Sequence, residues 1–424
     1  MRKTVVVAVL VLVSCGGSTP SSTLEGPSDT ATTKSASTTP VEVATTVAQP
    51  IKDEQAAFPA RLALTTKDSE IVTFSPNVEP VSTWGVVAPT GKVAATTVFA
   101  DGKTTIRWHD LMTDAITAEV TIDGEFRATA VEQGGKIVAL IDPADGSTTV
   151  VLATPEQGEM RRWTFPTVVV PEAFANAFAP EGNGLPIGVF VIEYLAADTY
   201  RVRVIDTASG QLGLPLNLRD KSQTVDEVMT AVSRTAVFEP MHQLLFTLYQ
   251  DATEGGEDLG AFIHTLGLIN GVWCLDVPPS LGLADHPGAL AVSPGGERLY
   301  AASSTGGVAM FVINDLTDFS ADMPVARQTA HLDAKASRVA IGASAREVVV
   351  ALDGTIYRLD PITLAVRDSF AWDMSVEALT VLADDNIVLA GTGRMTMVSP
   401  DEHLLAQRVL PALTEEVTRL AVVN

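Results

Sequence analysis

The residues of this chain that could do chemistry are mostly carboxylates, and several recur at one position of a repeated pattern. Each comes shortly before a run of small apolar residues, and two histidines accompany them. If those runs meet in the fold, the carboxylates form a ring whose negative potential favours a cation or a basic ligand. The alternative is a set of solvated connectors, because Asp is common in turns. The candidate residues are Glu125, Glu172, Asp226, Asp285, His286, His331, Asp333, Asp373 and Glu415.

No catalytic residue is predicted. The chain contains no Gly-x-Ser-x-Gly, no His-Glu-x-x-His and no phosphate-binding loop, and its six histidines lack metal-ligand spacing. No cofactor is expected. Calcium held by the carboxylate ring is the alternative that this acidic pattern leaves open.

The first residues predict an exported and lipid-modified protein. A basic start, Met1–Lys3, precedes an apolar run, Thr4–Val13, that is too short to be a stable membrane anchor. The run ends in Leu-Val-Ser-Cys, which resembles the bacterial lipobox and implies a signal peptide of residues 1–14 with palmitate-type acylation at Cys15. The alternative is an ordinary secretory signal with an incidental cysteine. The other cysteine, Cys274, lies in an apolar run, where a buried and unreactive thiol is expected.

Residues 15–57 are predicted to be a disordered tether. They are rich in Ser, Thr, Pro and Ala and contain no aromatic residue, so they cannot bury enough apolar surface to offset the entropy of ordering. The folded domain is assigned to residues 58–424. The full chain carries a formal net charge of −23, which excludes nucleic acid as a partner.

The folded domain repeats a unit of short strands separated by turns. The clearest unit is Pro287–Asp315, in which three strands alternate with turns containing Pro-Gly-Gly and Thr-Gly-Gly. Similar units recur about every 40–60 residues, which is the period of propeller blades rather than of helical repeats. The units begin near Trp84, Phe126, Ala173, Met229, Pro287, Ser337 and Val376.

The two ends of the domain complement each other. Arg61–Ser82 matches the second to fourth strands of a unit, and Val417–Val423 matches a first strand with nothing after it. The C-terminal strand is therefore predicted to complete the first blade and to close the ring, which removes open sheet edges. The predicted fold is an all-β propeller of about eight, alternatively seven, four-stranded blades.

The segment Ala291–Tyr300, with its Ser-Pro-Gly-Gly turn and Leu-Tyr strand, resembles the YVTN or surface-layer type of β-propeller repeat. The other units match only in pattern. The resemblance implies a propeller fold and a class that includes binding proteins, scaffolds and some lactonases, so it does not fix an activity.

We therefore expect a monomeric envelope lipoprotein, attached to the bilayer through Cys15. Its expected location in the cell is the outer side of the cytoplasmic membrane, or the periplasm or outer membrane in a diderm host. The propeller is expected to bind a protein, a peptide or an envelope polymer without catalysis. The alternative function is a lactonase-like or metal-dependent hydrolase that uses the carboxylates at the channel mouth, and a plain structural spacer also fits the sequence.

Overall fold

The computed structural model describes residues 61–423 with gaps, and nearly all of its regular structure is β-strand. The described helices are α1 (Ile313–Thr317) and a 3₁₀ turn, η1 (Pro279–Leu281). No helix in this part of the chain is long and apolar enough to cross a bilayer. The predicted all-β class is confirmed, whereas the signal peptide, Cys15 and the tether lie outside the described residues. The gaps are 67–69, 75–80, 114, 143–145, 176–187, 197–198, 218–221, 224–227, 231–232, 251–260, 270, 318–325, 392, 402–403 and 410–416.

The three sheets nearest the C-terminus show the repeating unit in its simplest form, four antiparallel strands in chain order. The segment Pro287–Asp315 supplies three strands of the first of these sheets, as predicted. The strands are β22 (Gly288–Val292), β23 (Arg298–Ser303), β24 (Gly307–Val312), β25 (Gln328–His331), β26 (Val339–Ala343), β27 (Val348–Leu352), β28 (Thr355–Leu359), β29 (Val366–Ala371), β30 (Ala378–Val381), β31 (Ile387–Gly391), β32 (Arg394–Val398) and β33 (Leu404–Val409).

The first sheet has seven strands because β3 belongs to two sets of four. The first part of β3 pairs with β2, and Gly85–Val87 pair with β4. The C-terminal strand lies beside β1, with Val423 opposite Arg61. It thus takes the innermost position of the first set, as predicted, while closure of the whole ring stays a prediction. The strands are β34 (Val417–Val423), β1 (Arg61–Thr66), β2 (Glu70–Phe74), β3 (Val81–Val87), β4 (Val93–Ala100), β5 (Lys103–Asp110) and β6 (Ala115–Asp123).

Hydrogen bonding divides the described strands into seven sheets, and the first sheet holds two blade units. Counting blade units therefore gives eight, and counting hydrogen-bonded sheets gives seven, which are the two predicted numbers. The remaining strands are β7 (Arg127–Val131), β8 (Val138–Ile141), β9 (Thr148–Thr154), β10 (Gly158–Phe165), β11 (Val168–Ala175), β12 (Gly188–Tyr194), β13 (Thr199–Asp206), β14 (Leu212–Gly213), β15 (Leu216–Asn217), β16 (Ser222–Gln223), β17 (Met229–Thr230), β18 (Ser233–Glu239), β19 (Leu244–Gln250), β20 (Ala261–Gly267) and β21 (Gly271–Asp276).

One unit begins later than predicted. Met229 lies in β17, which pairs with β13 of the preceding sheet, and the next inner strand begins at Ser233. This pairing is possible because β14 occupies only the far end of β13, opposite Val204 and Ile205. Met229 is buried there in a cluster that includes Tyr200.

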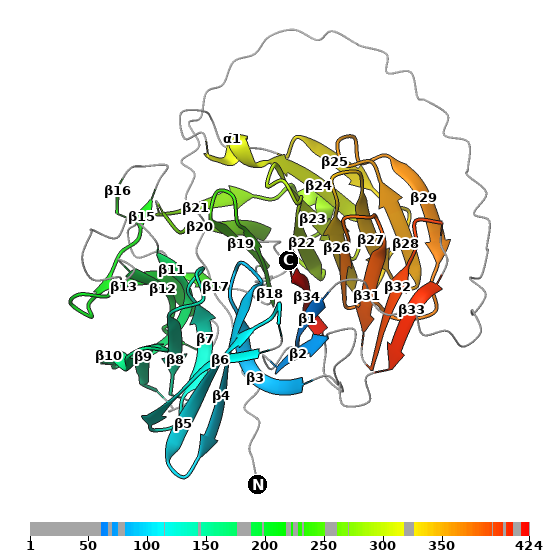
Figure 1. The fold of residues 1–424 in the computed structure, drawn as a ribbon. Helices are drawn as coiled ribbons and strands as arrows, with labels where there is room; N and C mark the ends of the chain where they lie inside the picture. Colours follow the sequence, from blue (N-terminus) through cyan, green and yellow to red (C-terminus); the bar gives the residue numbers. More distant parts are fainter. Residues whose placement is uncertain are drawn as a thin grey trace, which may run out of the picture.

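Apolar side chains are buried mainly between neighbouring sheets rather than in a single central core. One cluster joins the β22–β25 sheet to the β26–β29 sheet through Tyr300 and Ile341, and the next joins β26–β29 to β30–β33 through Phe370 and Leu379. The inner strands β22, β26, β30 and β34 follow one another side by side, and Figure 1 shows β22, β26 and β34 near the C-terminus in the middle of the molecule. This radial stacking of sheets is the architecture of a β-propeller.

Candidate binding pocket between the inner strands

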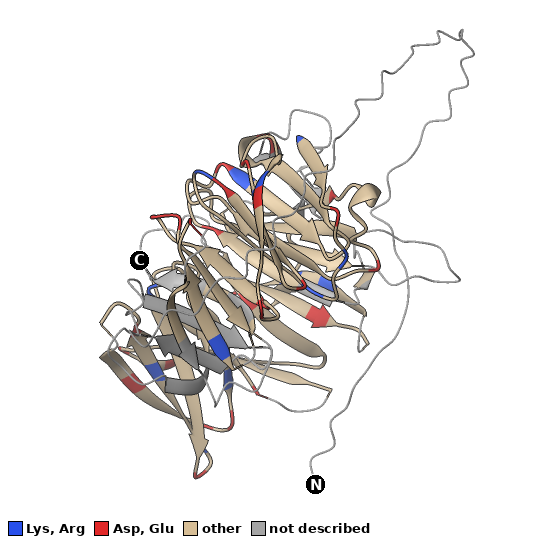
Figure 2. Cartoon of the chain, turned by 90° about the vertical axis from the view of Figure 1, so that its right-hand side faces the viewer, with Lys and Arg blue, Asp and Glu red and all other residues tan. Residues whose placement is uncertain are grey.

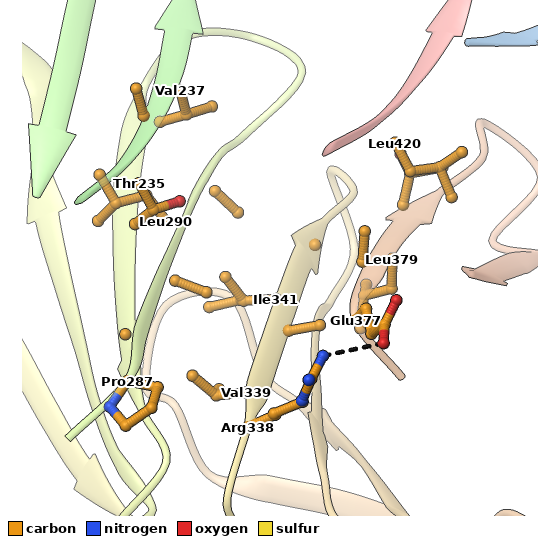
Figure 3. Close-up of a pocket in the computed structure, with 18 of the residues that line it drawn as sticks. Thr235, Val237, Pro287, Leu290, Arg338, Val339, Ile341, Glu377, Leu379 and Leu420 are labelled. Atoms are coloured by element: carbon orange, nitrogen blue, oxygen red, sulfur yellow. Dashed lines mark hydrogen bonds and ion pairs between the residues drawn. The ribbon is translucent and has the colours of Figure 1, made fainter. Parts of the chain in front are cut away.

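A cavity of about 460 Å³ lies between the inner strands β18, β22, β26, β30 and β34. Most of the side chains that line it are apolar, and Figure 3 shows those of Leu290, Ile341, Leu379 and Leu420 around it, although polar and apolar atoms contribute about equally to its surface. Each of these residues comes from a different inner strand, so the shape of the cavity depends on how the sheets are arranged. A cavity of this size lies within the range of ligand-binding sites.

The inner strands carry small residues because neighbouring strands approach closely there. A Cβ atom at Gly342 would lie 2.5 Å from Leu379 of the next inner strand, and one at Gly288 would lie 2.6 Å from Leu248 of β19 in the preceding sheet. Real Cβ atoms do not come so close to other atoms. The small-apolar pattern that identified these strands in the sequence therefore reflects packing around the cavity.

Two charged residues line the cavity, and they pair with each other at one end of it. Arg338 Nη1 donates to Glu377 Oε1 over 2.9 Å (Figure 3), and the Glu377 side chain is only 6% exposed. The other oxygen of Glu377 accepts the backbone N–H of Val417 over 2.9 Å. One carboxylate thus connects the starts of three successive inner strands, β26, β30 and β34.

The inner strands all run in the same direction, so their first residues lie at the same end of the cavity. Arg338 and Glu377 directly precede β26 and β30 and therefore mark the end where the connectors enter. Gln250, also in the cavity wall, donates to the carbonyl oxygens of Leu283 and His286 and holds the connector before β22. The entrance is thus built from hydrogen-bonded connectors.

The carboxylates and histidines predicted for this entrance do not line the cavity in the described part of the chain. Asp285 and His286 lie in the connector before β22, and both are exposed. His331 is the last residue of β25, an outer strand, so its side chain is not in an entering connector as predicted. Glu125 and Asp333 are exposed in connectors, Glu172 lies within β11, and Asp226 and Glu415 are outside the described residues.

Asp373 already has a partner, because Arg394 Nη2 donates to its Oδ1 over 2.9 Å. Among the residues that the structure describes, no group of three or more His, Cys, Asp or Glu side chains is placed to hold a metal ion. Trp372, the residue before Asp373, packs edge-on against Phe370 with ring centres 6.3 Å apart. It therefore contributes to packing between the last two sheets.

The sequence analysis missed Arg338 and Glu377. The available signal was positional, because each is a charged residue directly before the small-apolar inner strand of two consecutive units. Their opposite signs at equivalent positions could have suggested a pair between adjacent blades. Elsewhere acidic and basic residues interleave along the sheets instead of separating into areas of one sign (Figure 2).

Comparison with known proteins finds structural likeness but no family. No protein-family model matches the chain, and no curated protein matches it. Solved structures with a similar fold include BamB from Moraxella catarrhalis, at 15% identity and a TM-score of 0.49, covering 80% of this chain and 90% of that chain. They also include Sqt1 from Saccharomyces cerevisiae, at 13% identity and a TM-score of 0.49, covering 85% of this chain and 90% of that chain. A third is apo AztD from Citrobacter koseri, at 10% identity and a TM-score of 0.46, covering 87% of this chain and 99% of that chain. Likeness at this level gives no information about ligand or partner.

Proposed function

We propose that this protein is an envelope lipoprotein whose propeller binds a protein or peptide partner, without catalysis, through the pocket between its inner strands. The observation that carries the proposal is the pocket itself, a cavity of about 460 Å³ lined mostly by apolar side chains, with one ion pair at its entrance. Such a cavity accepts apolar side chains from an inserted loop or peptide, and the Arg338 guanidinium, 40% exposed, places a positive charge beside it.

The rigidity of the wall supports this function. Leu290, Ile341 and Leu379 are held by strands paired to neighbours along their length. A wall that is ordered before binding loses little conformational entropy when the partner arrives, so more of the contact energy appears as affinity.

The attachment to the membrane is proposed from the sequence. The lipobox-like Leu-Val-Ser-Cys at residues 12–15 supports acylation of Cys15, and the tether of residues 15–57 would let the propeller reach partners away from the bilayer. The close resemblance of Ala291–Tyr300 to the YVTN or surface-layer repeat supports the same class of exported propellers.

The pocket is tested by site-specific photo-crosslinking in living cells. A photoreactive residue replaces Leu290 in the pocket, and the control places it at Ile362, an exposed position on an outer turn. We expect one partner adduct that forms from position 290 and not from position 362. The same adduct from both positions would contradict binding in the pocket.

The purified partner is then titrated by calorimetry against variants in which the pocket is filled. Ile341→Trp and Thr235→Phe should each weaken binding at least tenfold, while circular dichroism shows that they remain folded. Undiminished affinity in both variants would overturn the proposal. Separately, Cys15→Ser should remove incorporation of an alkynyl fatty acid and release the protein from the membrane fraction.

A further inference from the structure

The strand β4 has an inner edge that is only partly covered. Three of its residues, Ala94–Thr96, pair with Gly85–Val87 of β3. The earlier part of β3 turns away to pair with β2. On the other side β4 pairs with β5 over its whole length, from Val93 to Ala100. Among the described residues, no strand pairs with the inner edge of β4 from Thr97 to Ala100.

The backbone groups on that edge can be assigned from the hydrogen-bond pattern. The N–H of Ala88 donates to the carbonyl oxygen of Val93 over 2.8 Å, so Val93 directs its backbone groups toward β3. Backbone direction alternates along a strand, so Thr97 and Phe99 direct theirs toward the same edge. Val98 directs its N–H toward β5. An uncovered edge of this kind is a template for another strand.

The side chains on this edge are apolar and exposed. Val98 is 42% exposed and Phe99 is 47% exposed, which is high for residues of this size in a strand. In Figure 1 the β4–β5 hairpin extends beyond the neighbouring strands. Thr97 is buried, at 7% exposed, so the accessible part of the edge is Val98–Ala100, which offers apolar contacts on both faces of an added strand.

The hairpin is ordered by contacts with the next connector. The Thr104 hydroxyl donates to the carbonyl oxygen of Gly124 over 2.6 Å and accepts the N–H of Phe126 over 2.8 Å. The N–H of Gly124 in turn donates to the carbonyl oxygen of Gly102 over 2.9 Å. A partner strand would thus meet an edge that already has its bound shape, which favours binding.

We propose that the inner edge of β4, from Val98 to Ala100, is a docking edge for an extended peptide strand of a partner protein. The backbone N–H and C=O of Phe99 specify the chemical class, because an extended polypeptide presents complementary groups at strand spacing. The charges around the hairpin tip specify which charge the residues flanking the partner strand should carry. Asp101, Asp123 and Glu125 there outnumber the two cations Lys103 and Arg162, the second of which donates to the carbonyl oxygen of Asp123, so a strand with basic flanking residues fits better than one with acidic flanks. This site lies apart from the pocket and does not depend on it.

The test uses the full chain and a fluorescein-labelled peptide, Lys-Thr-Val-Thr-Val-Thr-Lys, with its derivative N-methylated at all five central residues as control. Amide exchange is followed by NMR in the free and the peptide-bound protein. We expect the Phe99 amide to exchange quickly in the free protein and at least tenfold more slowly with peptide. The Val98 amide, which faces β5, should be protected throughout. The N-methylated derivative keeps the side chains but has no central N–H on either edge to complete the ladder, so it should not bind.

Two variants complete the test. Phe99→Pro removes the donor on the inner edge, and Phe99→Ala removes the apolar contact, so each should weaken peptide binding at least tenfold. Ile341→Trp, which fills the pocket, should leave peptide binding to β4 unchanged. This variant therefore distinguishes failure of the docking-edge proposal from failure of the proposal that a partner binds in the pocket. Slow exchange of Phe99 in the free protein, no peptide binding, or equal binding of the N-methylated derivative would overturn the proposal. Concentration-dependent dimerisation with the same protection would overturn it in favour of a second copy of this chain.

Discussion

The Glu377 carboxylate joins three segments that are distant in the sequence. It binds Arg338 from the preceding unit and the N–H of Val417 from the C-terminal strand. Because its side chain is almost fully buried, the charge depends on these partners more than a surface carboxylate would. The Asp373–Arg394 pair offers a contrast, since its carboxylate is 76% exposed.

We expect Arg338→Ala to destabilise the protein by about 2 kcal/mol, because the buried Glu377 loses a charged partner. The matched control Arg394→Ala removes a solvent-exposed pair and should cost less than about 1 kcal/mol. Denaturant unfolding of the two variants and the parent measures the difference. Equal costs for the two substitutions would show that the pair at the pocket entrance is no stronger than a surface pair.

His109 provides a prediction about pH. Its Nε2 lies 2.8 Å from the Thr96 hydroxyl, and burial together with the nearby charge of Arg107 lowers its pKa below the ordinary 6.5. The unfolded chain therefore binds this proton more readily, so the folded state should lose stability as the pH falls below about 6.5. His109→Gln should flatten this part of the stability profile, measured as the urea midpoint against pH. The exposed His331→Gln is the control and should retain the slope of the parent; an unchanged slope in His109→Gln would contradict the prediction.

At the scale of elements, the turns that follow the inner strands are held by side chains that bond to the backbone. Ser293 Oγ accepts the N–H groups of Glu297 and Arg298. In the preceding unit the buried Glu239 accepts those of Met241 and His242. The two turns touch, because Gly296 packs directly over the Glu239 carboxylate.

This contact makes two glycines with similar backbones behave differently. Gly296 and Gly102 have φ values of 67° and 75°. A Cβ at position 296 would lie 2.2 Å from Glu239 Oε1, whereas one at position 102 would meet nothing within 4 Å. Gly102→Ala should therefore cost about 1 kcal/mol from backbone strain alone, and Gly296→Ala about 3 kcal/mol from strain plus the clash. Thermal unfolding of both variants measures this, and equal losses would contradict the contact.

The turns between the third and fourth strands share a motif that the sequence analysis did not use. Asp110, Asp206 and Asp360 each accept the N–H groups of the residues two and three positions later. The N–H groups of Thr363 and Ile362, with Arg367, hold the pKa of Asp360 well below its usual range. The spacing Asp-x-x-Ser/Thr therefore marks these turns, because a carboxylate placed there replaces missing backbone acceptors.

At the scale of the whole molecule, the two ends of the described chain meet. Arg61 lies opposite Val423 in the pairing of β1 with β34. Val417 and Leu420 of β34 are buried with Ala378 and Val388 of the last sheet. The first unit is thus built from both ends of the chain and depends on a contact that is not covalent.

A circular permutant tests this arrangement. A short Gly-Ser linker joins residue 424 to residue 58, and the chain is opened between Pro155 and Glu156 in the exposed turn after β9. Because β34 and β1 then form a covalent hairpin, the permutant should fold with an unfolding midpoint at or above that of the matching chain from residue 58 to 424. A permutant that fails to fold, or that unfolds earlier, would contradict the pairing of the two ends.

Local rules account for the part of the fold that the sequence predicted well. Strand and turn positions in the Pro287–Asp315 segment depend on residues a few positions apart, such as Ser293 and Gly296, and these were identified correctly. The shared strand β3 and the Met229 pairing were not predicted. Both depend on which edge of another sheet is free, and nothing in the neighbouring residues records that.

By itself the sequence determined the all-β class, the repeating four-stranded unit and the partnership of the last strand with the first. The alternation of apolar and polar residues and the chemistry of turns act over a few residues. The first unit lacks its inner strand, and the extra strand at the C-terminal end of the chain is visible in the sequence as its replacement. The tertiary structure alone decided that β3 serves two sets of strands, which leaves Val98 and Phe99 on an open edge. It also decided that Arg338 and Glu377, 39 positions apart, pair at a pocket. Such contacts depend on the angle at which whole sheets stack, and that angle results from all their side chains together.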